Sequence, residues 1–242
     1  MIALLIPALC RHCYIFSENN QKNLKEMTWT EIESVFENCR DMCKKANRKP
    51  YFYITGGDPI LHSRFWDLME LFKAHNIAFT ILGNPFHLND DVCKKLKYYG
   101  CERYQLSIDG LRETHYAMRK KGSFDTTIEK LKCLHKAGIR SAIMTTVSGV
   151  NAEKLPGIID LVVENKVNVF AFARYAPTSY EKSIHLTPEK YRIERTAIRN
   201  TVRSSRKSQS GKWKRSNYYL YLRRYLWSGR NSNFSSCELA FL

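Results

Sequence analysis

The feature that most constrains the fold is an alternation of short apolar, β-prone runs with segments of helical periodicity, from the start of the chain to about residue 175. Six runs have the composition of strands buried on both faces: 2–6, 51–55, 78–82, 103–108, 142–147 and 168–172. Strands of this kind joined by helices form a parallel sheet covered by helices. Periodicity alone leaves open a doubly wound sheet and an incomplete (β/α) barrel. In both, functional residues gather at the carboxyl ends of the strands.

Capping residues indicate where several helices begin or end. Thr28 or Thr30 is expected to start the first helix after the opening segment. Ser123 is expected to cap a later helix that ends at Gly138. Asn151 has the position of a cap before a helix with Pro156 near its start. After residue 177, Thr187 caps a further helix that is expected to run to about residue 204.

Length and composition exclude several classes of protein. The chain has 242 residues, of which 44% are hydrophobic, which is too apolar for a mainly disordered chain and enough for one sizeable domain with an appendage. No run approaches the roughly 18 apolar residues that span a bilayer, so no membrane partner is expected. The apolar residues 1–9 lack a charged leader and a cleavage site. We therefore expect a cytoplasmic protein with reduced thiols.

The positive charge is concentrated at the carboxyl-terminal end. The net charge is +16, and residues 201–242 carry nine basic side chains against one acid, Glu238. Three regions are expected: a core over 1–180, a connecting helix over 181–204, and a basic, aromatic tail over 205–242. Basic and aromatic side chains such as Lys212, Trp213 and Arg223 offer nucleic-acid binding as an alternative of another class. A solvated tail with no partner is the favoured interpretation of these residues, so a nucleic-acid partner is not expected.

Two cysteines follow the first expected strand as Cys10-Arg-His-Cys13-Tyr14. Thiolates three positions apart on a tight turn can ligate one metal ion or one cluster. Taken alone, this CxxC pair is compatible with zinc, a redox disulfide or an iron–sulfur cluster. No second CxxC is present to complete a four-thiolate zinc site.

The residues at other strand ends narrow these alternatives. The second expected strand ends in Tyr53-Ile-Thr-Gly-Gly-Asp-Pro59, and the fourth in Gln105-Leu-Ser-Ile-Asp-Gly110. Arg119 closes the run from His115, and Gly122-Ser-Phe-Asp follows it. With the cysteine pair, these motifs resemble the radical SAM superfamily, specifically the core of its peptide- and protein-modifying enzymes with a SPASM-type extension. The resemblance implies an incomplete (β/α)6 barrel of parallel strands with outer helices, here followed by a short basic carboxyl-terminal segment.

In that family a Cx3Cx2C loop holds a [4Fe–4S] cluster by three thiolates. Cys10 and Cys13 match the second and third ligands, and Tyr14 matches the aromatic residue that usually follows. The first ligand is expected at position 6, where the sequence has Ile6. Three explanations are open: a misplaced start or shifted reading frame, a degenerate and inactive relative, or completion of the site by His12 or a distant cysteine.

The resemblance also implies contacts with S-adenosylmethionine. Gly56, Gly57 and Asp58 match the family's GGE motif, with Asp in place of the commoner Glu, and contact the ammonium end of the cofactor. Ser107 and Arg119 match positions that meet its carboxylate, for which a guanidinium fork and a hydroxyl are suited.

Four neighbouring residues have simpler interpretations. Asp109 and Gly110 are expected to shape the turn, and the capping role of Asn151 suffices without a function. Arg174, at the end of the sixth expected strand, either reaches cofactor or substrate or is an ordinary rim arginine. The remaining cysteines are interpreted as core or surface thiols, and the other histidines show no metal-ligand spacing.

The function implied by the resemblance is reductive cleavage of S-adenosylmethionine to a 5′-deoxyadenosyl radical, which abstracts hydrogen from a peptide or protein. Its cofactors are a [4Fe–4S] cluster and S-adenosylmethionine. Its partners are that substrate and a reductant such as a flavodoxin or ferredoxin. The alternative is a catalytically inactive or truncated relative that lacks the first cluster cysteine. With Cys237 as its one cysteine, the tail is expected to be a truncated or degenerate SPASM-type extension.

Overall fold

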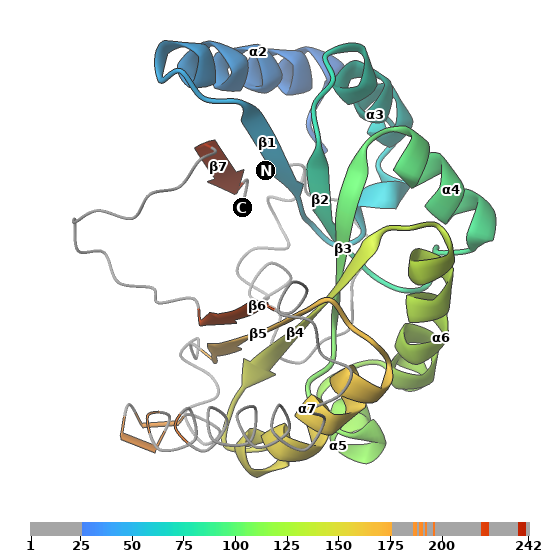
Figure 1. Ribbon diagram of the computed structural model, residues 1–242, viewed down its shortest axis with the longest axis vertical. Coiled ribbons are helices and arrows are strands. Elements are labelled where there is room, and N and C mark those ends of the chain that lie inside the picture. Colours follow the sequence, from blue (N-terminus) through green and yellow to red (C-terminus); the bar gives the residue numbers. More distant parts are fainter. Residues whose placement is uncertain are drawn as a thin grey trace, which may run out of the picture.

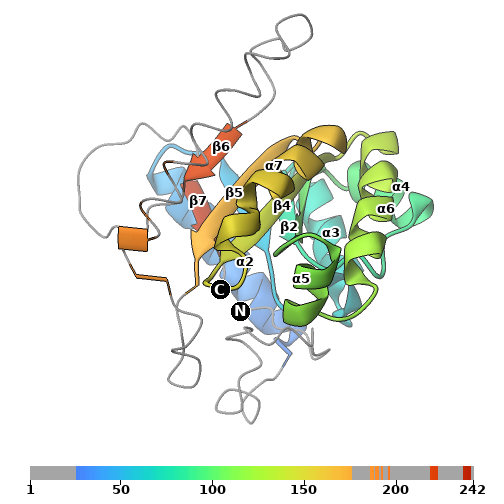
Figure 2. The ribbon, with the colours of Figure 1, turned by 90° about the horizontal axis from the view of Figure 1, so that it is seen from below.

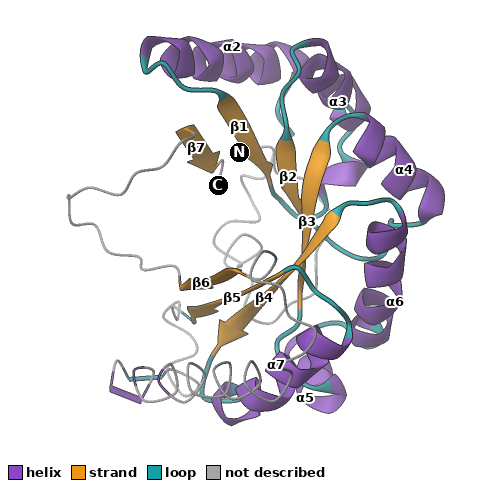
Figure 3. Ribbon diagram, in the orientation of Figure 1, coloured by secondary structure: helices purple, strands orange, loops and turns teal. Residues whose placement is uncertain are grey.

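A computed structural model describes residues 26–175 throughout, then residues 186, 187, 189, 190, 192 and 196, and the backbone of residues 219–222 and 237–240. Its centre is a curled sheet of parallel strands with helices on the convex side, an incomplete barrel (Figures 1 and 3). This confirms the expected barrel class over the described residues. The first expected strand, 2–6, and most of the connecting helix and tail lie outside them.

Five parallel strands form the body of the sheet: β1 (Pro50–Ile54), β2 (Phe79–Leu82), β3 (Cys101–Ser107), β4 (Arg140–Val147) and β5 (Val169–Arg174). Each pairs with its neighbour in chain order. Two short strands flank them, also parallel: β6 (Tyr219–Leu222) beside β5 and β7 (Cys237–Ala240) beside β1. The five internal strands were predicted within two residues at each end.

Helices connect the five strands and cover the convex face, as the view from below shows (Figure 2). They are α2 (Trp29–Lys45), α3 (Phe65–Ala74), α4 (Asp90–Tyr98), α5 (Arg112–Met118), α6 (Ser123–Lys136) and α7 (Leu155–Glu164), with 3₁₀ turns η1 (Pro59–Leu61) and η2 (Ala152–Lys154). No helix in the described part of the chain is both long and apolar enough to cross a bilayer.

Most of these helices end in the same way. A residue with left-handed backbone follows α2, α3, α4, α6 and α7, and at Gly138 this confirms the expected stop after α6. The next residue then bonds back across the last turn, as Ile77 N does to Phe72 O and Ile139 N to Leu134 O, both at 2.9 Å. After α3, α6 and α7 this C-terminal motif turns a buried apolar side chain inward just before the next strand begins, namely Ile77, Ile139 and Val167. It therefore sets the direction of the strands.

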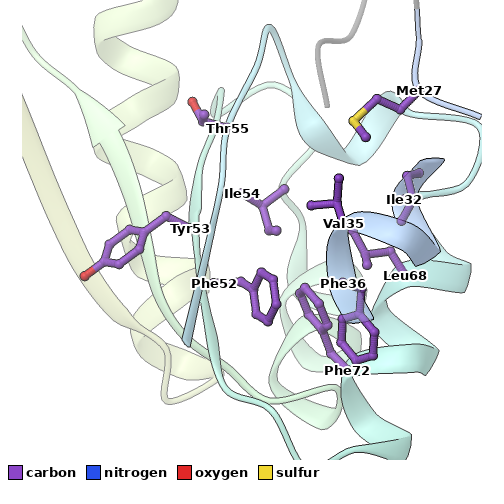
Figure 4. A pocket seen from close by; sticks show the side chains of 10 residues that line it. All are labelled: Met27, Ile32, Val35, Phe36, Phe52, Tyr53, Ile54, Thr55, Leu68 and Phe72. Carbon is purple, nitrogen blue, oxygen red and sulfur yellow. The ribbon is translucent and has the colours of Figure 1, made fainter. Parts of the chain in front are cut away.

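Aromatic packing fixes α2 and α3 against the first two strands. The rings of Phe36, Phe52, Phe72 and Phe79 form a chain of contacts with centroids 4.9–5.9 Å apart. A mainly apolar pocket opens beside them between α2, α3 and β1 (Figure 4), lined by Met27, Ile32, Val35, Phe36, Phe52, Tyr53, Ile54, Thr55, Leu68 and Phe72. Among the described residues the lining is almost entirely apolar, and most of it belongs to the hydrophobic core.

Thr28, not Thr30, starts α2. The Glu31 backbone N–H donates to Thr28 Oγ1, and the Glu31 carboxylate accepts from the Thr28 backbone N–H at 2.7 Å. This reciprocal pair is a capping box, which satisfies two backbone donors that the helix itself cannot pair.

Replacing Thr28 by Ala removes half of this box. We expect the free energy of unfolding to fall by about 1 kcal/mol, with a melting temperature lower by roughly 2–4 °C. Thermal denaturation followed by circular dichroism measures both. Thr30→Ala is the matched control, since Thr30 is exposed two residues further along and is not the cap. Equal losses in the two variants would contradict the assignment of the cap to Thr28.

Candidate functional site

The carboxyl ends of the parallel strands meet at one edge of the sheet, and the polar residues singled out by sequence follow these ends. Gly56–Asp58 follows β1, Ser107 is the last residue of β3, and Arg119 directly follows α5. Two further segments reach the same edge: the loop after β2, residues 83–89, and the loop after β4, residues 148–151. In α/β barrels this is the edge at which ligands bind.

The turn after β1 brings its backbone close to the strand end. Gly56 has φ +150°, a value that favours glycine over every residue with a Cβ. Gly57 is buried, and its carbonyl accepts a bond of 3.0 Å from the side chain of Asn84, which follows β2. The glycine pair thus lets the backbone of the turn lie against the neighbouring loop.

Asp58 lies almost completely buried at the end of this turn, with 1% of its surface exposed. Its Oδ2 bonds to His87 Nδ1 at 2.7 Å. Among the described residues, Oδ1 has no hydrogen-bond partner. Burial raises the pKa of the Asp58 carboxyl above its ordinary value, and the bond to His87 opposes that rise. A half-satisfied buried carboxylate is an acceptor suited to a cationic ligand group.

Tyr104 of β3 anchors the loop after β2 to the sheet. The Tyr104 hydroxyl donates to Asn84 O at 3.0 Å, and the ring is fully buried. Gly83 makes room for it, because a Cβ there would lie 2.4 Å from the Tyr104 hydroxyl oxygen. Burial raises the pKa of Tyr104 well above its ordinary value, so this residue remains a neutral donor. The loop that carries Asn84 and His87 is therefore fixed to the sheet.

Arg119 forms an ion pair with the buried carboxylate of Asp109, two residues after the end of β3. The arginine donates from Nε to Asp109 Oδ2, and its side chain is 17% exposed. The other carboxylate oxygen, Oδ1, accepts from the backbone N–H of Thr146 in β4 at 2.7 Å. Asp109 thus connects the arginine to the adjacent strand and fixes the plane of its guanidinium group.

Asn151 holds Asp109 from the other side, and its predicted capping role is wrong. It precedes η2 without a side-chain capping bond. Instead, its Nδ2 donates to Asp109 O and to Thr146 O, both at 2.8 Å, and its Oδ1 accepts from Ser148 N at 2.8 Å. The side chain is fully buried and joins the loops after β3 and β4. Because both polar atoms of this buried amide already bond to the neighbouring loops, the side chain is not available to cap a helix.

A buried histidine completes this network, and it replaces the capping role expected for Ser123. His115 Nδ1 accepts from Asp109 N at 3.1 Å, and its Nε2 bonds to Ser123 Oγ at 2.9 Å. The cap of α6 is Gly122, with left-handed backbone, and Ser123 is its first helical residue. The Ser123 hydroxyl donates to Lys120 O and lies beside the buried imidazole of His115, so it does not bond to the free N–H groups of the first helical turn. The prediction of a Ser123 cap is wrong for this reason.

The remaining predicted residues divide into those at this edge and those outside the described part of the chain. Ser107 is half-buried at the end of β3. Arg174 ends β5 and donates to Leu186 O at 3.3 Å. Gly110 shapes the turn as expected, because a Cβ there would lie 2.6 Å from Thr114 Cβ. Cys10, Cys13 and Tyr14 lie outside the described residues. Within those residues, no three metal-binding side chains come together.

Several members of the site were missed by sequence reasoning, including Asn84, Tyr104 and His115. Asp109 was interpreted as a turn residue, and His87 as a histidine without partner spacing. A signal for His87 existed, because Asp58 and His87 follow consecutive parallel strands. What the sequence does not contain is the direction in which each side chain turns at the strand end.

The carboxyl edge of the sheet carries one anionic and one cationic side chain that could each bind a charged ligand group. Asp58 Oδ1 is a buried acceptor for an ammonium group, and the guanidinium group of Arg119, held by Asp109, can bind a carboxylate. The chain is thus an α/β half-barrel protein that carries a buried carboxylate and a paired arginine at the carboxyl edge of its sheet.

Comparison with known proteins identifies the family to which the chain belongs. The model of the Radical SAM superfamily matches residues 7–162, and the chain belongs to that superfamily. The resemblance inferred from the motifs is confirmed. Members of the superfamily bind a [4Fe–4S] cluster and S-adenosylmethionine, the two cofactors expected from sequence.

Individual proteins are similar to the chain in sequence or in fold. The chain is 29% identical over 150 residues to the mycofactocin maturase MftC of Mycolicibacterium smegmatis, which covers 60% of this chain and 36% of the maturase. In fold it is similar to anSMEcpe with bound AdoMet and Kp18Cys peptide (TM-score 0.66, 20% identity, 79% and 55% covered). It is also similar to Streptococcus suis SuiB bound to precursor peptide SuiA (TM-score 0.68, 17% identity, 88% and 45% covered). The chain spans only part of each of these proteins.

Asn151→Ala tests the buried network. Three hydrogen bonds are lost and buried groups of the neighbouring loops are left unpaired, so we expect unfolding to require about 2–4 kcal/mol less. Chemical denaturation measures the change. The control is Asn38→Ala on the exposed face of α2, where the side chain makes one bond of 3.5 Å to Ser34 and a change within about 0.5 kcal/mol is expected. A small, equal effect of both variants would contradict the proposed role of Asn151.

Asp58→Asn tests the electrostatic state of the buried carboxyl. Because the folded pKa is raised above the ordinary 3.8, the contribution of Asp58 to stability is full below that value and is lost as the pH rises through the folded pKa. We therefore expect the variant to be more stable than the wild type at about pH 7, with an advantage that shrinks as the pH is lowered. Melting temperatures across pH measure this difference.

Asp160→Asn, on the exposed surface of α7, serves as the control and should shift stability little at any pH. A destabilised Asp58→Asn protein at neutral pH would show that the ionised carboxylate is favourable where it lies.

Proposed function

We propose that this chain is the core of a radical SAM enzyme that abstracts hydrogen from a peptide or protein substrate. The observation that carries the proposal is the pair of charged groups at the carboxyl edge of a family-matched barrel. Asp58 and Arg119 have opposite charges, and both are held by neighbouring side chains.

The residues of the chain divide the work of holding the cofactors. Cys10 and Cys13 would ligate the cluster, with Tyr14 beside them. Asp58 would accept from the ammonium group of S-adenosylmethionine, with Gly56 and Gly57 allowing a close approach of the backbone. Arg119 and Ser107 would bind its carboxylate. When bound, cluster and cofactor supply one-electron reductive cleavage and hydrogen-atom abstraction.

The contribution of the described residues is preorganisation. Asp109 and Asn151 fix the arginine before any ligand arrives, so binding does not have to order a long flexible side chain. Tyr104 and Asn84 do the same for the loop that faces Asp58. Rigid placement of this kind lets a reactive cofactor meet its substrate in one orientation.

A peptide or protein substrate is supported by the relatives. One is named a maturase, and two of the solved structures contain a peptide. A reductant such as a flavodoxin or ferredoxin would supply the electron, and the cytoplasm would provide the reducing conditions that exposed clusters require. We further propose the division into a core over 1–180, a connecting helix over 181–204 and a tail over 205–242. The bond of 3.2 Å from Lys190 N to Thr187 Oγ1 supports a helix that starts at Thr187 within the 181–204 region.

A specific residue favours a second possibility, a relative without radical chemistry. Ile6 stands where the first cluster cysteine is expected. With two thiolates the cluster would lack one anionic ligand, although the S-adenosylmethionine contacts would be intact. Nucleic-acid binding by the tail is not favoured by any relative.

Anaerobic reconstitution with iron and sulfide, followed by a reductant and S-adenosylmethionine, decides between them. Production of 5′-deoxyadenosine by the chain supports the enzyme. If the chain binds S-adenosylmethionine but forms neither cluster nor product, and Ile6→Cys restores both, the inactive relative is correct and the missing ligand is its cause.

Arg119→Lys tests the carboxylate contact in the same protein. A lysine cannot reproduce the planar fork or the bond from Nε to Asp109, so we expect S-adenosylmethionine to bind roughly 10- to 100-fold more weakly in calorimetry. Arg140→Lys, at the opposite edge of the sheet and half-exposed, is the matched control and should bind like the wild type. Unchanged affinity in Arg119→Lys would exclude Arg119 from the site.

A further inference from the structure

The pair formed by Asp58 and His87 joins the turn after β1 to the loop after β2. Asp58 is buried, whereas the His87 side chain is 42% exposed and comes from the loop after β2. A partly exposed imidazole therefore bonds to a carboxylate that is shielded from solvent. Burial of that carboxylate raises its pKa and disfavours its charged form, so placing Asp58 here costs free energy of desolvation.

The two oxygens of Asp58 are in different situations. Oδ2 is held by His87 Nδ1 at 2.7 Å, and Oδ1 has no partner among the described residues. Buried polar atoms are nearly always bonded, and an exception at a strand end marks a place for a ligand. An ionised carboxylate only accepts, so the missing partner must be a donor, and a cationic N–H donor also compensates the buried charge.

The loop around His87 is built to keep the imidazole in place. Asn84 Nδ2 donates to Gly57 O at 3.0 Å, and Tyr104 holds Asn84 O from β3 at 3.0 Å. Two side chains of the loop thus bond to the turn of Asp58: Asn84 Nδ2 donates to the Gly57 carbonyl, and His87 Nδ1 bonds to the Asp58 carboxylate.

We propose that His87 is a positioning residue, which holds Asp58 by Oδ2 so that Oδ1 faces the ammonium group of the bound amino-acid moiety. This inference rests on the proposed function and deepens it. The sequence has Asp where the family more commonly has Glu, so the carboxylate is one methylene shorter. His87 supplies the fixed partner that gives this short side chain a single orientation.

Binding of S-adenosylmethionine to the full chain, measured by calorimetry, tests the inference through rescue by a conservative variant. His87→Ala removes the donor, and we expect affinity to fall about tenfold. His87→Asn places an amide N–H where Nδ1 stood, and affinity should return to within about threefold of the wild type. Since His87 is half-exposed, neither variant is expected to unfold the chain. His75→Ala, an exposed histidine at the other end of the sheet, is the control.

A double variant separates positioning from direct contact. In an Asp58→Ala background, His87→Ala should cause no further loss, because His87 acts through Asp58. Wild-type affinity in His87→Ala, or equal losses in His87→Ala and His87→Asn, would overturn the inference. An additional loss in the double variant would do the same.

Nitrogen NMR of ¹⁵N-histidine-labelled protein gives a readout that needs neither cofactor nor activity. We expect the Nδ1 resonance of His87 to report a bonded ring nitrogen in the wild type and to change in Asp58→Ala. An unchanged resonance overturns the inference. If the resonance changes but no variant, including the wild type, binds S-adenosylmethionine, the pair exists and the proposed function, together with the ligand assigned to Oδ1, is wrong.

Discussion

The carboxylate of Asp109 is the point on which the carboxyl edge of the barrel depends. It is completely buried, and one side chain connects the end of β3 with β4 through Thr146 N and with Arg119 through an ion pair. Its backbone carbonyl and amide are engaged as well, by Asn151 and His115. A buried charge costs several kcal/mol unless it is paired and hydrogen-bonded, so the loss of one partner is expected to destabilise the rest of this network. That requirement fixes the loops after two strands and the helix between them.

The apolar part of the fold supplies the rigid base for this network. The aromatic chain from Phe36 to Phe79 fixes the early helices to the sheet, and the helix ends turn apolar residues inward just before the strands. Helices and strands can therefore tolerate change on their outer faces, whereas the strand ends cannot. The site residues lie in those ends, where the backbone is held by side-chain bonds rather than by the sheet.

The same division explains how much could be predicted from the sequence. The strands from β1 to β5 and the stop at Gly138 follow from alternation and from glycine chemistry, which are local signals. The capping roles of Ser123 and Asn151 were wrong because each side chain has a partner distant in sequence or buried beside it, His115 for one and Asp109 for the other. The motif residues at strand ends were found through the family, but their supporting partners were not. His87 and Asp109 act through geometry that no spacing contains.

Asp58 and Asp109 show how one residue type serves two purposes at one edge. Both are buried and both follow a strand. Asp109 has partners on both oxygens and keeps a cation of the chain in place, so its charge is balanced before a ligand arrives. Asp58 is bonded to His87 on Oδ2, its Oδ1 has no partner among the described residues, and burial raises the pKa of its carboxyl, which disfavours the charged form relative to an exposed carboxyl. An arriving ammonium group would therefore recover the free energy that burial of this carboxylate costs. Binding of the ligand's positive end would therefore offset the unfavourable burial of Asp58. The negative end would meet Arg119, whose charge is partly neutralised and whose orientation is held by Asp109.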